Sequence, residues 1–175
     1  MNNLPTIIND GIVLRPIDIS DTDLIVKWRN NDRVKNNFIY RGKFDKETHE
    51  KWMRTKVKSG ETVQYIIEYD EQPIGSIYFR DINKLYKSAE FGILIGEDSA
   101  AGKGIGFSAT KLFVEFGFEY LKLHRISLRH LKKNNVAHRL YSEVGFVEEG
   151  VFRDMVYLDG AYQDVVFMAI VAPNH

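Results

Sequence analysis

Three glycines at alternate positions, Gly102, Gly104 and Gly106, form the pattern in this sequence that points most directly to chemistry. They follow an apolar segment and open a long amphipathic one. Glycine lets a backbone approach a ligand closely, and the first turn of a helix leaves its amide groups unpaired. Together with the positive end of the helix dipole, those amides suit a pyrophosphate. We therefore expect an anion site here, with an ordinary glycine-rich turn as the alternative.

Two common phosphate-binding motifs do not fit this segment. A Walker loop has the pattern G-x-x-x-x-G-K-[ST], but Lys103 is followed by Gly104, and Glu97 stands five positions before Gly102. The dinucleotide fingerprint G-x-G-x-x-G needs a third glycine where Phe107 stands. Kinases and nicotinamide-dependent dehydrogenases are therefore poor interpretations.

The segment between Glu119 and Glu143 contains no acidic residue. In a chain without net charge, such a basic region would complement a ligand with several phosphates, although a solvated surface explains it equally well. Its basic side chains are Lys122, Arg125, Arg129, Lys132, Lys133 and Arg139, joined by His124, His130 and His138.

Tyr141 lies on a predicted helix over residues 134–143 and shares one face with Ala137, Leu140 and Val144. A tyrosine on an apolar face is usually a core residue whose hydroxyl makes one hydrogen bond. Taken alone, this pattern favours packing over catalysis.

Hydrophobic periodicity predicts a single α/β domain of the α+β type over residues 11–171, with tails at 1–10 and 172–175. The central sheet is expected to be mixed, mostly antiparallel and flanked by helices. Asp159-Gly160 is a strong hairpin signal. The expected strands cover 11–17, 63–69, 73–81, 87–95, 125–130, 146–157 and 161–170, and the expected helices begin after Ser20 or cover 45–58, 104–121 and 134–143.

The composition excludes several classes of protein. Lys and Arg number 24, as do Asp and Glu, which argues against a general nucleic-acid coat. The absence of cysteine excludes disulfides, a thiolate nucleophile and cysteine-ligated zinc. No run of about 18 apolar residues is present, and residues 1–10 lack the pattern of a secretory signal. We expect a cytoplasmic protein with no nucleic-acid or membrane partner.

Two of these segments together resemble motifs of the GNAT superfamily of N-acetyltransferases. Residues 101–106 match [Q/R]-x-x-G-x-[G/A] except at Ala101, and residues 134–146 match N-x-x-A-x-x-[LF]-Y-x-x-x-G-F at every fixed position. Residues 89–96 look like the splayed fourth strand of that fold, so the resemblance covers essentially the whole chain. The pattern is closest to the branch that contains ribosomal-protein alanine and amino-sugar nucleotide N-acetyltransferases.

The resemblance implies acetyl-CoA as co-substrate and no metal. The backbone of residues 93–95 would hold the pantetheine arm like an added strand, and the amides of the glycine segment would hold the pyrophosphate. Ala101 replaces a Gln or Arg that often contacts the cofactor, which would weaken cofactor affinity without abolishing it. The implied cofactor-binding residues are Ile93, Leu94, Ile95, Ala101, Gly102, Lys103, Gly104, Ile105, Gly106, Phe107 and Asn134.

The resemblance also gives Tyr141 a catalytic role as the acid that protonates the departing CoA thiolate. Since no cysteine could form an acyl intermediate, we expect direct transfer through a ternary complex. A backbone amide of the splayed strand would stabilise the oxyanion. Glu90 is the first candidate for the base, acting directly or through water, although an ion pair explains this carboxylate equally well.

The acceptor site is expected in the N-terminal third, where Trp28-Arg29-Asn30 and His49-x-x-Trp52 resemble a subgroup that acetylates nucleotide-linked 4-amino-4,6-dideoxy sugars. Aromatic rings stack on sugars and arginine binds a diphosphate, but packing explains both tryptophans and the histidine as well. We expect a small-molecule primary amine, with an amino-sugar nucleotide first. Protein N-terminal amines, polyamines and a non-catalytic acetyl-CoA sensor are the alternatives. The terminal hairpin fits either a homodimer contact or an internal role.

Overall fold

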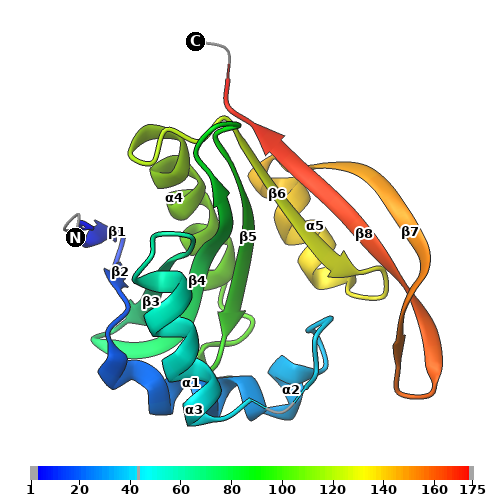
Figure 1. Ribbon diagram of the computed structural model, residues 1–175, viewed down its shortest axis with the longest axis horizontal. Helices are drawn as coiled ribbons and strands as arrows, with labels where there is room; N and C mark the ends of the chain where they lie inside the picture. The colour runs from blue at the N-terminus through cyan, green and yellow to red at the C-terminus, as the bar shows by residue number, and fades with distance from the viewer. Residues whose placement is uncertain (1–3, 43, 174–175) are drawn as a thin grey trace.

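The computed structural model describes residues 4–42 and 44–173, which contain one eight-stranded sheet with helices on both faces (Figure 1). The strands are β1 (Ile7–Asn9), β2 (Ile12–Pro16), β3 (Val63–Tyr69), β4 (Gln72–Asn83), β5 (Ser88–Ile95), β6 (Arg125–Leu131), β7 (Val147–Leu158) and β8 (Ala161–Val171). The helices are α1 (Thr22–Asn30), α2 (Asp32–Lys35), α3 (Lys46–Trp52), α4 (Ile105–Glu119) and α5 (Asn135–Val144), with short helical turns η1 (Ile19–Asp21), η2 (Met53–Val57) and η3 (Asp98–Ala100).

The sheet has the order β1-β2-β3-β4-β5-β6-β8-β7. Every neighbouring pair is antiparallel except β5 and β6, which are parallel and are connected through α4. The prediction of a mixed, mostly antiparallel sheet with flanking helices is therefore confirmed. The parallel pair is the point where the sheet changes direction.

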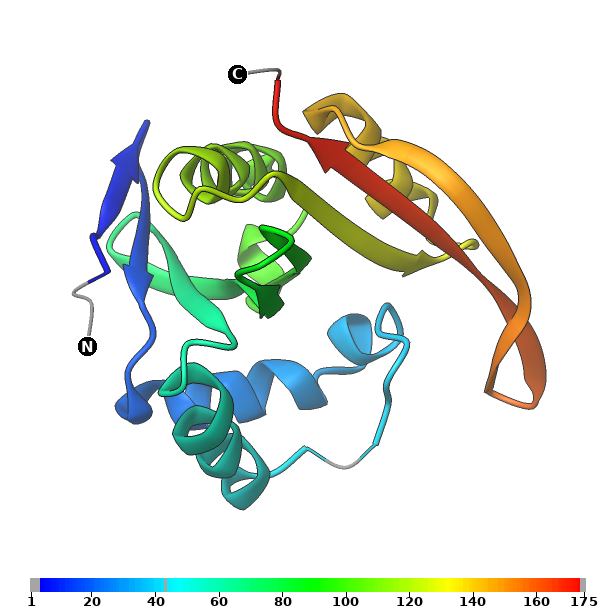
Figure 2. The same cartoon turned by 45° about the horizontal axis from the view of Figure 1, so that its top comes forward.

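The sheet separates two helical layers, as Figure 2 shows, with α1, α2 and α3 on one face and α4 and α5 on the other. Side chains alternate between the faces of a strand, so β4 sends Ile77 and Phe79 into the α4 layer and Tyr78 and Arg80 into the α1 layer. The larger core lies under α4, where Phe79 stacks on Phe113 with ring centroids 4.4 Å apart. A smaller core lies under α1 and contains Ile25, Trp28, Val34, Ile66 and Leu94.

Local turn chemistry explains several of the element boundaries. Asp159 and Gly160 both have positive φ, 53° and 79°, which is the geometry of a tight hairpin turn between β7 and β8. Gly145, at φ 114°, ends α5 as expected. The hairpin and the α5 cap are both confirmed.

Two features differ from the sequence prediction. Residues 7–9, placed in the N-terminal tail, form β1 and pair with β2 across an Asp10-Gly11 turn, a hairpin signal that the prediction missed. Ser20 does not cap the first helix. Asp18 instead accepts from the amide of Ser20 and forms a capping box with Asp21. The domain limits at 11 and 171 stay a prediction, although the sheet itself extends beyond the first of them.

Candidate active site

The gap between β5 and β6 is the central feature of the candidate site. The two strands pair only at their beginnings, where Ser88, Ala89 and Glu90 face residues 125–127. From Phe91 onward β5 pairs with β4 alone, so its other edge is open, and β6 diverges from it with β8 (Figure 1). An open edge offers backbone groups to an extended ligand. Ile93, Leu94 and Ile95, predicted to hold the cofactor arm, lie on this edge.

The glycine segment leads from this edge into α4. Gly102 and Gly104 have φ values of 75° and 78°, and a Cβ on either would meet nothing within 4 Å. Glycine is therefore needed for its backbone conformation, not to avoid a clash. Among the described residues, the backbone amides of 102–106 donate to no backbone acceptor. These unpaired amides at a helix N-terminus fit the pyrophosphate of acetyl-CoA.

Gly106 brings three parts of the site together. A Cβ at this position would lie 3.3 Å from the Leu140 side chain and 3.9 Å from Ile95. The first turn of α4 therefore lies against both the end of β5 and the middle of α5. In this way the glycine turn is next to the helix that carries Tyr141.

The other residues predicted around the cofactor differ in exposure and in their place in the helices. Ala101 and Lys103 are exposed on the turn, and Ile105 and Phe107 belong to the first turn of α4. Asn134 caps α5, with its Oδ1 accepting from the amide of Ala137 at 3.1 Å. The cap fixes the start of α5, and a cofactor contact by Asn134 stays a prediction.

Tyr141 projects from α5 into the aromatic core beside the gap. Its ring lies edge-on to Phe91 at 6.1 Å between centroids and near Phe146 at 5.9 Å. Burial, followed by the influence of Tyr78, raises the pKa of Tyr141 above that of an ordinary phenol. A phenol that stays protonated at neutral pH can act as a general acid.

Glu90 is held by two arginines. Arg80 Nη2 donates to Glu90 Oε1 at 2.5 Å, and Arg129 Nη2 lies 3.1 Å from both carboxylate oxygens. This geometry is that of a partly buried ion-pair network at the closed end of the gap. A role as catalytic base stays a prediction, and the two ion pairs give Glu90 a structural role in their own right.

Tyr78 is a residue that sequence reasoning missed. It stands opposite Gly92 in the β4–β5 register, and a Cβ on Gly92 would lie 2.2 Å from Tyr78 Cζ. The Tyr78 ring therefore lies directly against the backbone of β5 at Gly92. Burial raises the pKa of Tyr78, while the charges of nearby arginines oppose that shift. Its position on the alternating pattern of β4 was the available signal.

Three of the four predicted acceptor residues have partners within the protein that explain them. Trp28 is fully buried, and its Nε1 donates to Glu97 at 2.7 Å. Asn30 donates to the carbonyls of Val26 and Phe44. His49 is 1 % exposed, with Nδ1 3.0 Å from Thr22 Oγ1, and burial lowers its pKa. Substrate contacts by these three residues stay untested, and the burial of Trp28 and His49 argues against them.

The fourth predicted acceptor residue, Arg29, has a charged group that is not fully buried. It lies half-buried at the end of α1, and its Cζ is 3.7 Å from the centroid of Phe38. This contact is a cation–π interaction that fixes the guanidinium. Arg29 therefore remains a candidate acceptor residue.

The basic region after Glu119 is partly neutralised on the surface. Lys132 pairs with Asp164 at 3.2 Å, and Arg139 with Glu143 at 2.8 Å. Arg125 pairs with Glu149. The interpretation as a solvated, balanced surface therefore accounts for these three side chains.

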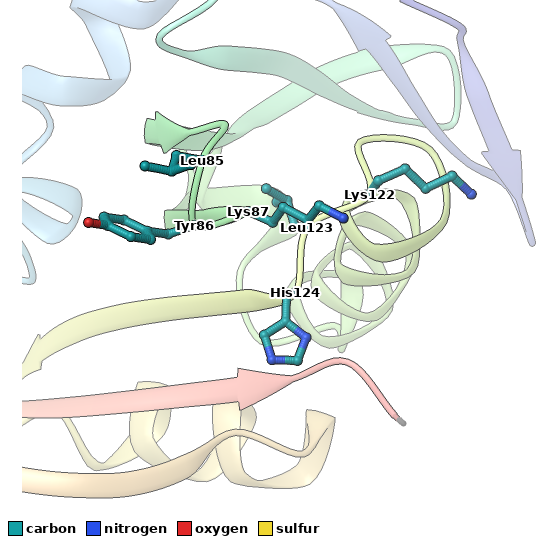
Figure 3. Close-up of a pocket in the computed structure, with 6 residues that line it drawn as sticks. All are labelled: Leu85, Tyr86, Lys87, Lys122, Leu123 and His124. Carbon is teal, nitrogen blue, oxygen red and sulfur yellow. The ribbon is translucent and has the colours of Figure 1, made fainter. Parts of the chain in front are cut away.

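A surface hollow lies near the closed end of the β5–β6 gap and contains none of the predicted cofactor or acceptor residues, although Lys122 and His124 of the basic region line it (Figure 3). Within the described ranges, no group of three or more His, Asp or Glu side chains is arranged to hold a metal. No helix of these ranges is long and apolar enough to cross a membrane. The hollow is lined by Leu85, Tyr86, Lys87, Lys122, Leu123 and His124.

Comparison with known proteins decides the family. The family model described as an acetyltransferase (GNAT) domain matches residues 12–147. This chain belongs to the GNAT acetyltransferase family. It is an N-acetyltransferase with the α/β GNAT fold, and acetyl-CoA is the co-substrate of the family. The superfamily resemblance is confirmed, while its ribosomal and amino-sugar branch is not singled out.

Proteins similar to this chain include polyamine acetyltransferases of Vibrio cholerae. Spermidine N(1)-acetyltransferase of serotype O1 is 28% identical over 168 residues, covering 95% of this chain and 96% of the relative. A spermidine N-acetyltransferase structure in complex with CoA and spermine has a TM-score of 0.87 at 28% identity, covering 93% of this chain and 96% of that one. A dodecameric spermidine N-acetyltransferase structure, also at 28% identity, has a TM-score of 0.81 and covers 93% and 95%.

Proposed function

We propose that this GNAT enzyme transfers the acetyl group of acetyl-CoA directly to a primary amine of a small molecule, with Tyr141 as the general acid. The observation that carries the proposal is the open edge of β5, which runs from the ion pair at Glu90 to the glycine turn beside α5. A thioester arm along this edge would end near a buried phenol whose pKa is raised.

Three groups of this chain support acetyl-CoA binding. The edge of residues 93–95 would accept the pantetheine arm as an added strand, and the unpaired amides of residues 102–106 would hold the pyrophosphate. Acetyl-CoA supplies the activated acetyl group as a thioester. Lys103 is exposed beside those amides and adds a positive charge. Ala101 offers no polar side chain, which is consistent with binding through the backbone alone.

The chemistry required of the protein is modest. The amine must lose a proton before it attacks, and the developing oxyanion needs an N–H donor, which the open edge of β5 provides. The thiolate that leaves must gain a proton, and Tyr141 is placed to donate one. Alignment of the two reactants supplies a further part of the rate. Without cysteine, direct transfer is the simplest route.

Relatives support a polyamine as the first acceptor to test. The relatives named above are spermidine N-acetyltransferases, which favours the polyamine alternative over the amino-sugar nucleotide predicted from the N-terminal motifs. The hydrogen bonds of Trp28, Asn30 and His49 within the protein weaken that motif further. The dodecameric relative makes a homo-oligomer the expected assembly.

The test is acetyl-CoA turnover with a panel of amines, measured for the wild type and Tyr141→Phe. Loss of the acid should lower kcat by about 10²- to 10⁴-fold, since this is the usual contribution of general acid catalysis. The affinity for CoA should stay within a factor of about two, because the phenol makes no contact that the pyrophosphate needs. Tyr157→Phe, an exposed tyrosine on β7, is the matched control and should change neither quantity.

Two results would contradict the proposal. Tyr141→Phe with full kcat would remove the phenol from the reaction. A protein that binds CoA tightly but acetylates no amine of the panel would favour the non-catalytic sensor.

A further inference from the structure

Arg29 is a half-buried guanidinium without a carboxylate partner in the described part of the chain. Its Cζ lies 3.7 Å from the centroid of Phe38 and 5.1 Å from that of Phe44. Its Nη2 lies 3.5 Å from the carbonyl oxygen of Tyr40, at the limit of a hydrogen bond. Burial lowers the pKa of Arg29, since no anion compensates the charge. The aromatic rings thus fix the guanidinium and leave N–H donors for another acceptor.

Arg80 and Arg129 share the single carboxylate of Glu90. The Nε–H of Arg80 is buried and has no hydrogen-bond acceptor, with Asp81 at 3.8 Å. A guanidinium carries five donors in a planar fork, so two guanidiniums on one carboxylate retain spare donors. The group as a whole contains three arginines, Arg29, Arg80 and Arg129. It contains two carboxylates, those of Glu90 and Asp81, and therefore carries one positive charge in excess.

Tyr78 lies on the α1 face of the sheet with Arg80, and the ion pairs of Glu90 join Arg129 to Arg80 on that face. Tyr78, Arg80 and Glu90 point to this face by the alternation of β4 and β5, and Arg129 reaches Glu90 from β6. The charges of Arg29, Arg80 and Arg129 all act on Tyr78, and Tyr78 in turn acts on Tyr141. The cluster therefore lies next to the phenol that is the candidate acid, on the face opposite α5.

We propose that Arg29, Arg80 and Arg129 bind an anionic group of the acceptor, so that the favoured acceptor is an amine that also carries a phosphate or a carboxylate. The planar fork of a guanidinium matches either anion. A polyamine carries several positive charges and no anion, so the cluster repels it. This inference rests on the proposed acetyl transfer and narrows its acceptor. The cluster therefore argues against the polyamine that the similarity to spermidine-acetylating relatives favours, and the tests below decide between the two acceptors.

The first test measures anion binding to protein saturated with CoA, so that the glycine turn is already filled. Inorganic pyrophosphate and spermidine are titrated by calorimetry into wild type, Arg29→Gln and the control Arg54→Gln. Arg54 is exposed in η2, on a different helix from Arg29, and pairs with Glu50 of α3. Pyrophosphate should bind wild type and control alike and Arg29→Gln about tenfold more weakly, the value of one charged hydrogen bond. Spermidine should bind more weakly than pyrophosphate.

A second test uses small amines that differ in charge. Phosphoethanolamine and β-alanine distinguish a phosphate from a carboxylate, ethanolamine is the acceptor without an anion, and 1,4-diaminobutane is the polyamine. We expect kcat/KM to be highest for one of the two anionic amines. Arg29→Gln should remove most of that preference, because it should lower kcat/KM for the anionic amine far more than kcat/KM for ethanolamine.

Several results would overturn the inference. An equal affinity of wild type and Arg29→Gln for pyrophosphate is one, and a higher kcat/KM for 1,4-diaminobutane or spermidine than for both anionic amines is another. If Arg29→Gln does not fold, Arg129→Gln replaces it, and an unchanged pyrophosphate affinity in that variant has the same meaning. Pyrophosphate binding that depends on Arg29 without acetyl transfer to any amine would remove the proposed function and leave the anion site.

Discussion

Tyr141 and Tyr78 approach the gap between β5 and β6 from the two faces of the sheet. Tyr141 belongs to the core under α4 and α5, whereas Tyr78 covers Gly92 on the α1 side. Burial raises the pKa of both phenols, so both stay protonated at neutral pH. The motif around Tyr141 made it predictable. The alternation of β4 indicates the face on which Tyr78 lies, but its neighbours could not be predicted, because they come from strand pairing and not from adjacent positions in the sequence.

Two buried histidines, His49 and His130, should make the stability of the protein depend on pH. Burial lowers the pKa of His49 and of His130, so the folded protein disfavours their charged forms. The unfolded chain takes up those protons below about pH 6.5. Stability from these groups is therefore complete above that pH and is lost as the pH falls toward the lowered pKa values.

His49→Gln should flatten this dependence. Each such histidine adds at most about 1.4 kcal/mol per pH unit to the slope of the unfolding free energy. The measurement is urea unfolding of both proteins between pH 7.5 and pH 5. A variant that lost stability with falling pH as steeply as the wild type would show that His49 is not responsible.

The glycine turn shows most clearly how an element can leave backbone amides available for a ligand. Its left-handed residues turn the backbone so that the amides before and within the first turn of α4 remain unpaired. The sequence predicted this turn, the strands around it and α4 with small errors, because periodicity and turn residues are local signals. It did not predict α2, since a four-residue helical turn carries little periodicity of its own, and the helix predicted over 45–58 contains α3 and the π-helical η2 that follows it.

Gly104→Ala tests the turn against a matched control. Gly60 has the same geometry, with φ 79° and no atom within 4 Å of a Cβ, but lies in the turn before β3. Both substitutions should cost about 1–2 kcal/mol of unfolding free energy, the penalty of a left-handed non-glycine residue. Only Gly104→Ala should also weaken CoA binding, as measured by calorimetry. An equal CoA affinity in the two variants would show that the turn does not bind the cofactor.

At the scale of the whole molecule, two segments that are distant in the sequence meet beside Arg29, the predicted acceptor residue. The segment after α2 approaches the β7–β8 hairpin in Figure 1, where Arg41 pairs with Asp159 across 118 positions of sequence. Arg41 also donates to the carbonyls of Phe38 and Asn36, which shapes the segment beside Arg29. No local pattern predicts such a contact. Local patterns predict the elements and the cofactor turn, but the acceptor face is assembled from parts that only the fold brings together.

Arg41→Ala should therefore affect the acceptor more than the cofactor. Without the ion pair, the segment that carries Phe38 is held less firmly against Arg29, so we expect KM for the amine to rise several-fold, on the order of a charged hydrogen bond. The KM for acetyl-CoA should not change. Stability should fall by about 1–3 kcal/mol, because the Arg41 side chain is only 10 % exposed and its two hydrogen bonds to carbonyls are lost together with the ion pair. Arg54→Ala is the control, and equal effects of both variants on the amine KM would contradict this role.

A crystal structure with bound CoA tests the central claim most directly. We predict that the pantetheine arm lies along the open edge of β5, that the pyrophosphate contacts the amides of residues 102–106, and that the sulfur is within about 3.5 Å of the Tyr141 hydroxyl, allowing for the longer contacts of sulfur. CoA bound elsewhere, or a sulfur well away from that hydroxyl with the arm off the β5 edge, would contradict it.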